Sequence, residues 1–142
     1  MLLTTNIKTF ILANHVLSLA TIHAGDPWSA SCFYAWDERG ADLIIMSAED
    51  TLHGKAMLAR PAVAGTIAGQ PSLLPAIRGI QFRAQAHLLA DTMASEARKI
   101  YCRRHPVAQL KHSAIWRLAL IEIKFTDNSR IFGHKETWRR ES

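Results

Sequence analysis

The chain has 142 residues, of which 49% are hydrophobic, so it is long enough for one domain with a substantial core and too short for two. Its formal net charge of +5 favours an anionic partner without identifying one. The apolar runs fall short of a bilayer span and no secretory signal precedes them, which predicts a cytoplasmic protein with no membrane partner.

The first third of the chain predicts a helix followed by strands. Ile7, Phe10 and Ile11 recur at helical spacing, and "VLSLATI" at 16–22 has the composition of a strand. "HAGDP" then predicts a turn. "WSASCFYAW" and "ERGADLIIMS" together predict a hairpin, because a glycine-containing turn separates two strand-like segments.

The middle of the chain predicts a short helix between strands. "EDTLHGKAMLARP" has Asp50 as a candidate N-cap and Pro61 as its end, and "AVAGTIAGQ" after it predicts a buried strand. Gly65 and Gly69 weaken that strand, so each marks either a bulge or a close approach to the backbone.

The longest predicted strand is "IRGIQFRAQAHLLA", at 77–90, and it alternates strictly. One face carries Ile80, Phe82, Ala84, Ala86 and Leu88, while polar residues and Gly79 occupy the other. Arg78 belongs to the apolar face. Its guanidinium must therefore reach solvent, a carboxylate partner or an anionic ligand.

A helix, "MASEARKIYCRRHP", and a final strand, "IWRLALIEIKF", complete the pattern. About six strands and three helices, with the strands in antiparallel-like succession, indicate a small α+β barrel rather than a doubly wound parallel sheet. Basic residues are concentrated between Asp91 and Lys111. A solvated helix face explains this bias better than a nucleic-acid footprint does, because no aromatic residues alternate with the basic ones.

Common catalytic motifs are absent from the sequence. There is no GxGxxG, P-loop, GxSxG or HExxH pattern, and the seven histidines form no i,i+4 pair on a predicted helix, so no metal site is predicted. Cys32 and Cys102 have no CxxC or Cys/His ligand spacing, which favours reduced structural thiols.

Two short segments remain as candidate ligand-binding elements. Ser47, Thr51, His53 and Lys55 cluster where a buried strand gives way to a helix, and hydroxyls, basic groups and helix-start amides together suit a phosphate. Helix capping by Thr51 explains part of the same pattern equally well, and Glu49 and Asp50 oppose an anion. The small residues at 29–31 leave room for a flat ligand against the sheet, or are packing choices.

The order of these elements resembles the FMN-binding split-barrel superfamily of pyridoxamine 5'-phosphate oxidase over nearly the whole chain. The strings "AVAGTIAGQP", "IRGIQF", "ARKIYCRRHPVA" and "EIKFTDNSRIFGHKETW" are more closely similar to its YhbP-type branch. The resemblance implies one domain over residues 1–142: a mostly antiparallel, six-stranded split β-barrel with flanking helices. It also implies a homodimer that holds FMN at the subunit interface.

The same resemblance implies a set of cofactor-binding residues. Those lining the isoalloxazine would be Trp28, Ser29, Ala30, Ser31, Cys32 and Phe33. Those near the ribityl and phosphate groups would be Ser47, Thr51, His53 and Lys55. Those approaching the ring from the long strand and the C-terminal segment would be Arg78, Gly79, Phe132, Gly133 and Lys135.

The chain departs from the oxidase pattern at two points. Leu52 and His53 stand where oxidase relatives place a basic pair, which makes phosphate affinity weaker and more dependent on pH. The basic residues that hold the substrate phosphate in the oxidase have no clear match, so vitamin B6 oxidation is not predicted. For Arg78, the resemblance favours an anionic ligand, with Asp127 as the structural alternative.

Four functions fit these features. The first is an FMN-dependent oxidoreductase of unknown small-molecule substrate, for which His53, Tyr34 and His134 are the candidate proton donors. The second is haem binding or degradation with His134 as the axial ligand. The third is a non-enzymatic flavin or nucleotide binder. The fourth is deazaflavin chemistry, which no residue distinguishes from FMN.

Overall fold

The computed structural model describes residues 2–129 and 133–141. Its elements in chain order are α1 (Thr5–Ala13), β1 (Val16–His23), β2 (Asp26–Asp37), β3 (Asp42–Met46), α2 (Leu52–Ala59), β4 (Ala62–Ala68), the 3₁₀ helix η1 (Leu74–Ala76), β5 (Arg78–Leu88), α3 (Asp91–Arg104), the 3₁₀ helix η2 (Pro106–Leu110), β6 (Ile115–Asp127) and β7 (His134–Arg139). None of the described helices is both long and apolar enough to cross a membrane.

Six of the strands close into a barrel, as predicted. The strand order is β3-β2-β1-β4-β5-β6-β7, and a further pairing of β3 with β6 joins the two ends of the first six strands. All pairings among the described strands are antiparallel. The α+β class and the split-barrel fold are therefore confirmed.

The barrel is split along one edge of β6. Residues 115–119 of β6 pair with β3, whereas residues 122–127 pair with β7. Strand β7 lies outside the six-stranded prediction. Its sequence, "HKETWR", carries one buried apolar residue, Trp138, among polar ones, so hydrophobic alternation does not mark it as a strand.

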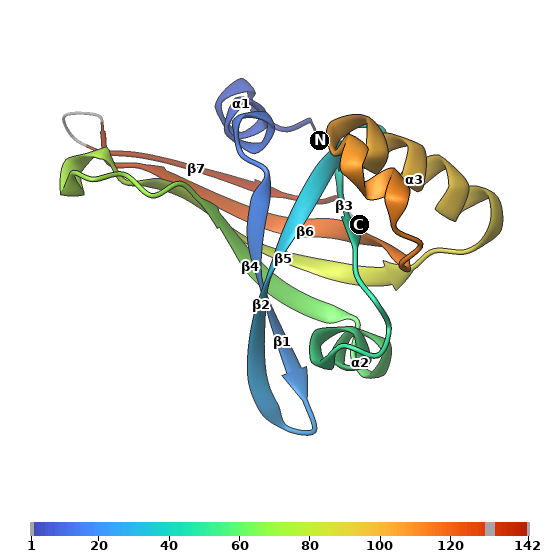
Figure 1. The fold of residues 1–142 in the computed structure, drawn as a ribbon. Helices are drawn as coiled ribbons and strands as arrows, with labels where there is room; N and C mark the ends of the chain where they lie inside the picture. The colour runs from blue at the N-terminus through green and yellow to red at the C-terminus, as the bar shows by residue number, and fades with distance from the viewer. Residues whose placement is uncertain (1, 130–132, 142) are drawn as a thin grey trace.

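Two arms extend from the barrel (Figure 1). The β1–β2 hairpin forms one arm, because β2 pairs with β3 only from Tyr34 to Asp37 and its earlier part pairs with β1 alone among the described strands. The start of β5, the end of β6 and the start of β7 form the other arm. The hairpin turns at Ala24 and Gly25, both with positive φ.

The main core fills the barrel, and α1 covers it with Ile7, Phe10 and Ile11. A second cluster lies outside the barrel, where α3 packs on Ala35, Ile44 and Ile115. This second cluster explains why β3 is apolar on both faces. The alternation of β5 is as predicted from Ile80 to Ala86.

Local details correct one expectation and decide another. The N-cap of α2 is Thr51, whose Oγ1 accepts a hydrogen bond from the Gly54 amide at 3.0 Å, so the prediction of Asp50 was wrong. Gly65 is a point of close approach: a Cβ there would lie 2.4 Å from Cζ of Phe82 and 2.5 Å from the Ser18 carbonyl oxygen. Gly69 has open space around it.

Candidate functional site

The predicted ring-binding segment lies on the open part of β2, residues 26–33. Trp28 and Phe33 are 50% and 52% exposed, and Ser29 and Ser31 between them are exposed as well. Ala30 is partly buried. Because side chains alternate along this regularly paired strand, exposed Ser29 and Ser31 share the outer face with Phe33, whereas Trp28 lies on the opposite face with Ala30.

Cys32 and Phe33 differ in their surroundings. Cys32 is buried in the main core and burial raises its pKa to about 11, so its thiol is protonated at neutral pH and is not a nucleophile. Phe33 points to the outer face, where its ring stacks on His15 at a centroid distance of 5.8 Å and meets the edge of His105 at 5.4 Å. Both cysteines are free and buried, as predicted.

Three of the four predicted phosphate-corner residues come together at the start of α2. Ser47 lies two residues beyond the last residue of β3 that pairs with β2. It is therefore next to the place where the open part of β2 meets the part that pairs with β3. Its Oγ is hydrogen-bonded to Nε2 of His53, and Thr51 Oγ1 lies 3.5 Å from the same nitrogen. Lys55 is exposed, and no described contact joins its side chain to this corner.

Two hydrogen bonds connect the backbone of the corner to β6 and to the loop before it. The Ser47 amide donates to the Ala114 carbonyl at 2.9 Å, and Nε1 of Trp116 donates to the Ser47 carbonyl at 2.8 Å. Burial lowers the pKa of His53, so its imidazole is neutral at pH 7. His53 therefore contributes a hydrogen-bonding group at neutral pH, rather than a positive charge.

The remaining predicted residues gather on the second arm. Arg78 lies directly opposite Asp127 in the β5–β6 register, and Gly79 and Lys135 both pair with Thr126. Gly133 precedes β7 with a φ of 68°. Phe132 lies outside the described residues.

Arg78 is exposed, and its guanidinium lies 5.6 Å from the centroid of the Phe10 ring. Asp127, the alternative carboxylate partner of Arg78, lies opposite it on β6. The Asp127 side chain is buried and accepts hydrogen bonds from Ser129. The side chain of Arg78 therefore remains accessible to an anionic ligand.

The two groups of predicted residues lie far apart within one chain. Leu88 pairs with Trp116, whose indole contacts Ser47, so the corner lies at the Leu88 end of β5. Arg78 begins the same strand, and its 11 residues span roughly 30 Å at about 3.3 Å per residue. Figure 1 shows the same separation, with α2 beside the β1–β2 hairpin and away from the β5–β7 arm.

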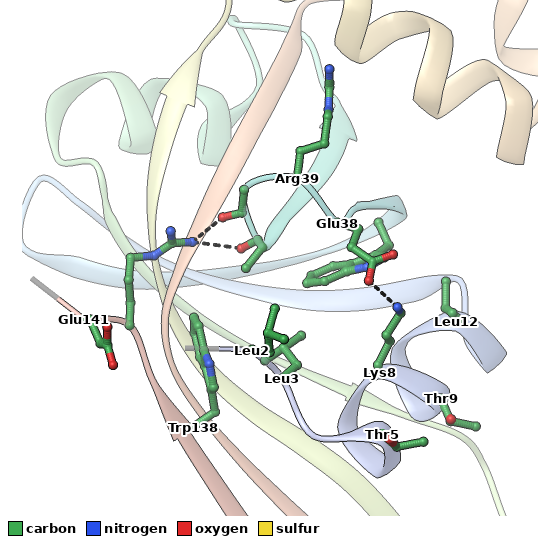
Figure 2. A pocket seen from close by; sticks show the side chains of 14 residues that line it. Leu2, Leu3, Thr5, Lys8, Thr9, Leu12, Glu38, Arg39, Trp138 and Glu141 are labelled. Carbon is green, nitrogen blue, oxygen red and sulfur yellow. Dashed lines mark hydrogen bonds and ion pairs between the residues drawn. The ribbon is translucent and has the colours of Figure 1, made fainter.

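A cavity that the sequence did not predict lies between α1, the β2–β3 turn and the C-terminal end of β7, with a volume of about 750 Å³ (Figure 2). Its cationic groups are already engaged. Lys8 pairs with Glu38, Arg39 contacts Asp37, and Nη2 of Arg140 donates to the Gly40 and Ala41 carbonyls at 2.7 and 3.0 Å. Internal pairing leaves this cavity poorly suited to an anion.

Sequence reasoning also missed His15 and His105 beside the open strand. Nε2 of His105 is hydrogen-bonded to the Tyr34 carbonyl at 2.7 Å, and its ring packs on Tyr101. His15, Phe33 and His105 come from three separate segments of the chain, so only tertiary packing brings them together. Among the described residues, no group of three or more His, Cys, Asp or Glu side chains is placed to hold a metal ion.

Comparison with known proteins gives the family. No family model matches the chain. A UPF0306 protein of Yersinia pestis bv. Antiqua (strain Angola) is 42% identical over 134 residues, which cover 94% of this chain and 91% of the relative. The chain belongs to the UPF0306 family.

Solved structures with the same fold as this UPF0306 chain are more distant in sequence. A haem-binding protein from Mycobacterium smegmatis has a TM-score of 0.79 at 17% identity, over 93% of this chain and 55% of that one, so the UPF0306 chain spans about half its length. An FAD-binding protein from Mesorhizobium loti has a TM-score of 0.68 at 17% identity, over 85% and 92% of the two chains. These likenesses concern the split-barrel fold alone.

Proposed function

We propose that this UPF0306 protein is an FMN-binding flavoprotein and an oxidoreductase of the pyridoxamine 5'-phosphate oxidase-like type, of the YhbP-type branch. The observation that carries the proposal is the open part of β2, where the exposed small side chains of Ser29 and Ser31 lie on the same face as the exposed ring of Phe33. A planar ring can lie on such a face with little steric hindrance. Two proteins that share the fold are named for planar cofactors, haem and FAD.

The corner beside this part of β2 fits a phosphate monoester. Ser47 Oγ, His53 and the first amides of α2 supply neutral donors, and the positive end of the helix dipole adds to them. Thr51 is committed to the cap, because its Oγ1 accepts from Gly54 and donates to the Ala48 carbonyl at 2.9 Å. Its role is to fix the helix start rather than to bind the ligand.

When bound, FMN would carry the electrons or hydride, while the protein orients the ring and excludes water from one face of it. Tyr34 does not serve as a proton donor, because it is buried, its hydroxyl donates to the Ile11 carbonyl at 2.6 Å, and burial raises its pKa. His53 and His134 remain the candidate donors.

A homodimer accounts for the separation of the predicted residues. The corner and Arg78 lie roughly 30 Å apart along β5, too far to hold one flavin, so a complete site takes the β2–α2 part from one chain and the β5–β7 arm from its partner. Exposed apolar residues on both arms support such an interface. They are Ile22, Trp28, Leu73, Leu74 and Ile77.

Haem is the second candidate, and the pairing of His134 with Glu136 favours it. Nε2 of His134 is hydrogen-bonded to Glu136 Oε2, and metal-ligating histidines commonly have such a carboxylate on the nitrogen that does not bind the metal. The other nitrogen, Nδ1, would then face the iron. Haem addition should give a Soret band that His134→Ala abolishes if this candidate is correct.

Titration with FMN and with riboflavin tests the flavin proposal. We expect bound-flavin absorbance and quenched fluorescence with FMN, and about tenfold weaker FMN binding in Ser47→Ala and His53→Gln. Riboflavin lacks the phosphate, so its binding should not change in these variants. Thr92→Ala, which removes an exposed hydroxyl from α3, is the matched control.

Absence of flavin binding at micromolar protein would overturn the proposal. Equal weakening of FMN and riboflavin would overturn the assignment of the corner to the phosphate. A flavin that binds but is never reduced by nicotinamide cofactors or any other donor would leave a non-enzymatic flavin binder. A deazaflavin bound in preference to FMN would replace the cofactor and retain the site.

A further inference from the structure

A second cavity, of about 530 Å³, lies between α3 and the segment that follows it. It shares no residue with the candidate flavin site. Its described lining residues lie between Ser95 and Arg103 on α3 and between Ala108 and His112 in the segment that follows.

The sequence builds this cavity from one helix face and a returning segment. Residues 95, 98, 99, 102 and 103 recur at three- and four-residue spacing, which places them on one face of α3. Ala97 and Tyr101 occupy the face that packs on the barrel. Helix α3 ends before Pro106, and η2 then brings Lys111 and His112 opposite the first face.

The charge of the cavity is one-sided. Four of its lining residues are Lys or Arg, and none of the described lining residues is Asp or Glu. The acidic residues of α3 lie elsewhere: Glu96 faces Arg39 at 3.8 Å, and Asp91 is in the first turn. The helix dipole explains basic residues in the last turn, including Arg103, but not Arg98, Lys99 or Lys111.

No Asp or Glu among the described residues forms an ion pair with Arg98. Its Nη2 donates to the Ser113 carbonyl at 2.7 Å, which fixes the guanidinium at the cavity wall. Its Nη1 is buried, and no described group accepts a hydrogen bond from it. A guanidinium held partly out of water without a carboxylate is costly, and an anion in the cavity would offset that cost.

We propose that this cavity binds a small, multiply charged oxyanion of the phosphate or diphosphate class. Its volume falls in the range of small-molecule sites. No Phe, Tyr or Trp is among its described lining residues, so it offers no stacking surface for a nucleobase. The cavity therefore recognises the phosphate groups of its ligand, through Arg98, Lys99 and Lys111.

Calorimetric titration of the full chain with inorganic diphosphate, in a phosphate-free buffer, tests the proposal. We expect saturable binding to the wild type and about tenfold or greater weakening in Arg98→Gln/Lys111→Gln. The control is Arg139→Gln/Lys124→Gln, which removes two exposed charges from β6 and β7 and should change the affinity less than about twofold. Should loss of Arg98 prevent folding, Lys99→Gln/Lys111→Gln alters two exposed residues instead.

Three results would overturn the proposal. The first is no saturable binding by the wild type, and the second is equal weakening in the cavity and control variants, which would indicate general charge attraction. The third is tighter binding of a single-stranded oligonucleotide through the same residues, which would assign the cavity to nucleic acid. Saturating FMN should leave diphosphate binding unchanged. Competition between FMN and diphosphate would mean that both bind at one site. Because diphosphate is titrated directly, the result is independent of whether FMN binds.

Discussion

At Gly65 the packing around the backbone determines which residue β4 can carry. A Cβ at this position would meet the Phe82 ring and the Ser18 carbonyl, and both belong to neighbouring, well-packed strands. Gly65→Ala should therefore lower the free energy of unfolding by about 1–3 kcal/mol, measured by urea denaturation. Gly69→Ala, with open space around the same added atom, should change it by less than about 0.5 kcal/mol. Equal effects of the two substitutions would contradict this packing.

His53 should make folding sensitive to acid. Its pKa is lowered by burial, so between the folded and unfolded pKa values the unfolded chain binds more protons. The contribution to stability is complete above about pH 6.5 and is lost as the pH falls through the lowered folded value. In His53→Gln, the free energy of unfolding should fall less steeply from pH 7 to pH 5 than in the wild type. Parallel curves for the two proteins would show that this imidazole titrates alike in both states.

At the scale of the elements, the side chain of Arg140 links the end of β7 to the β2–β3 turn. Arg140 donates to the Leu120 carbonyl at 2.5 Å and to the Gly40 and Ala41 carbonyls, and it lies 3.5 Å from the buried Asp42. Burial raises the pKa of Asp42 to about 6, and Arg117 and Arg140 partly oppose that rise. Arg140 therefore both stabilises the turn and favours the charged form of Asp42.

Arg140→Gln should lower the free energy of unfolding by about 2 kcal/mol or more, because three partly buried carbonyls lose a charged donor. Its neighbour supplies the control. Arg139 is exposed and pairs with Glu122 at the surface, so Arg139→Gln should change stability little. Thermal and urea unfolding of both variants measure the difference. A stable Arg140→Gln protein would mean that water replaces these hydrogen bonds without loss.

The elements also show what the sequence could reveal. Strand β5 was predictable because its alternation is local, and the corner at Ser47 because its residues lie within one turn of helix and the strand before it. Strand β7 was not, because one buried Trp138 in six residues leaves no periodic signal. The contact of Phe33 with His15 and His105 depends on how α1 and α3 pack, which no local pattern encodes.

For the whole molecule, the proposed site requires residues from two chains. A chain with Ser47→Ala and His53→Gln should bind FMN weakly, and so should a chain with Arg78→Gln. When the two are unfolded together and refolded as a mixture, heterodimers should regain one complete site each, and fluorescence titration should recover part of the high-affinity binding. Were no binding recovered, the corner and Arg78 would act within the same site of one chain. Full FMN binding by the Arg78→Gln chain alone would show that Arg78 has no part in the site.

Sedimentation velocity of the protein with equimolar FMN tests the central claim most directly. Recorded at the flavin absorption band, the bound cofactor should sediment with a species of twice the 15.9 kDa chain mass, carrying one FMN per chain. Flavin that stays at the meniscus while the protein sediments as a monomer would contradict the proposed dimeric flavoprotein and leave the split-barrel fold and the family as the secure findings.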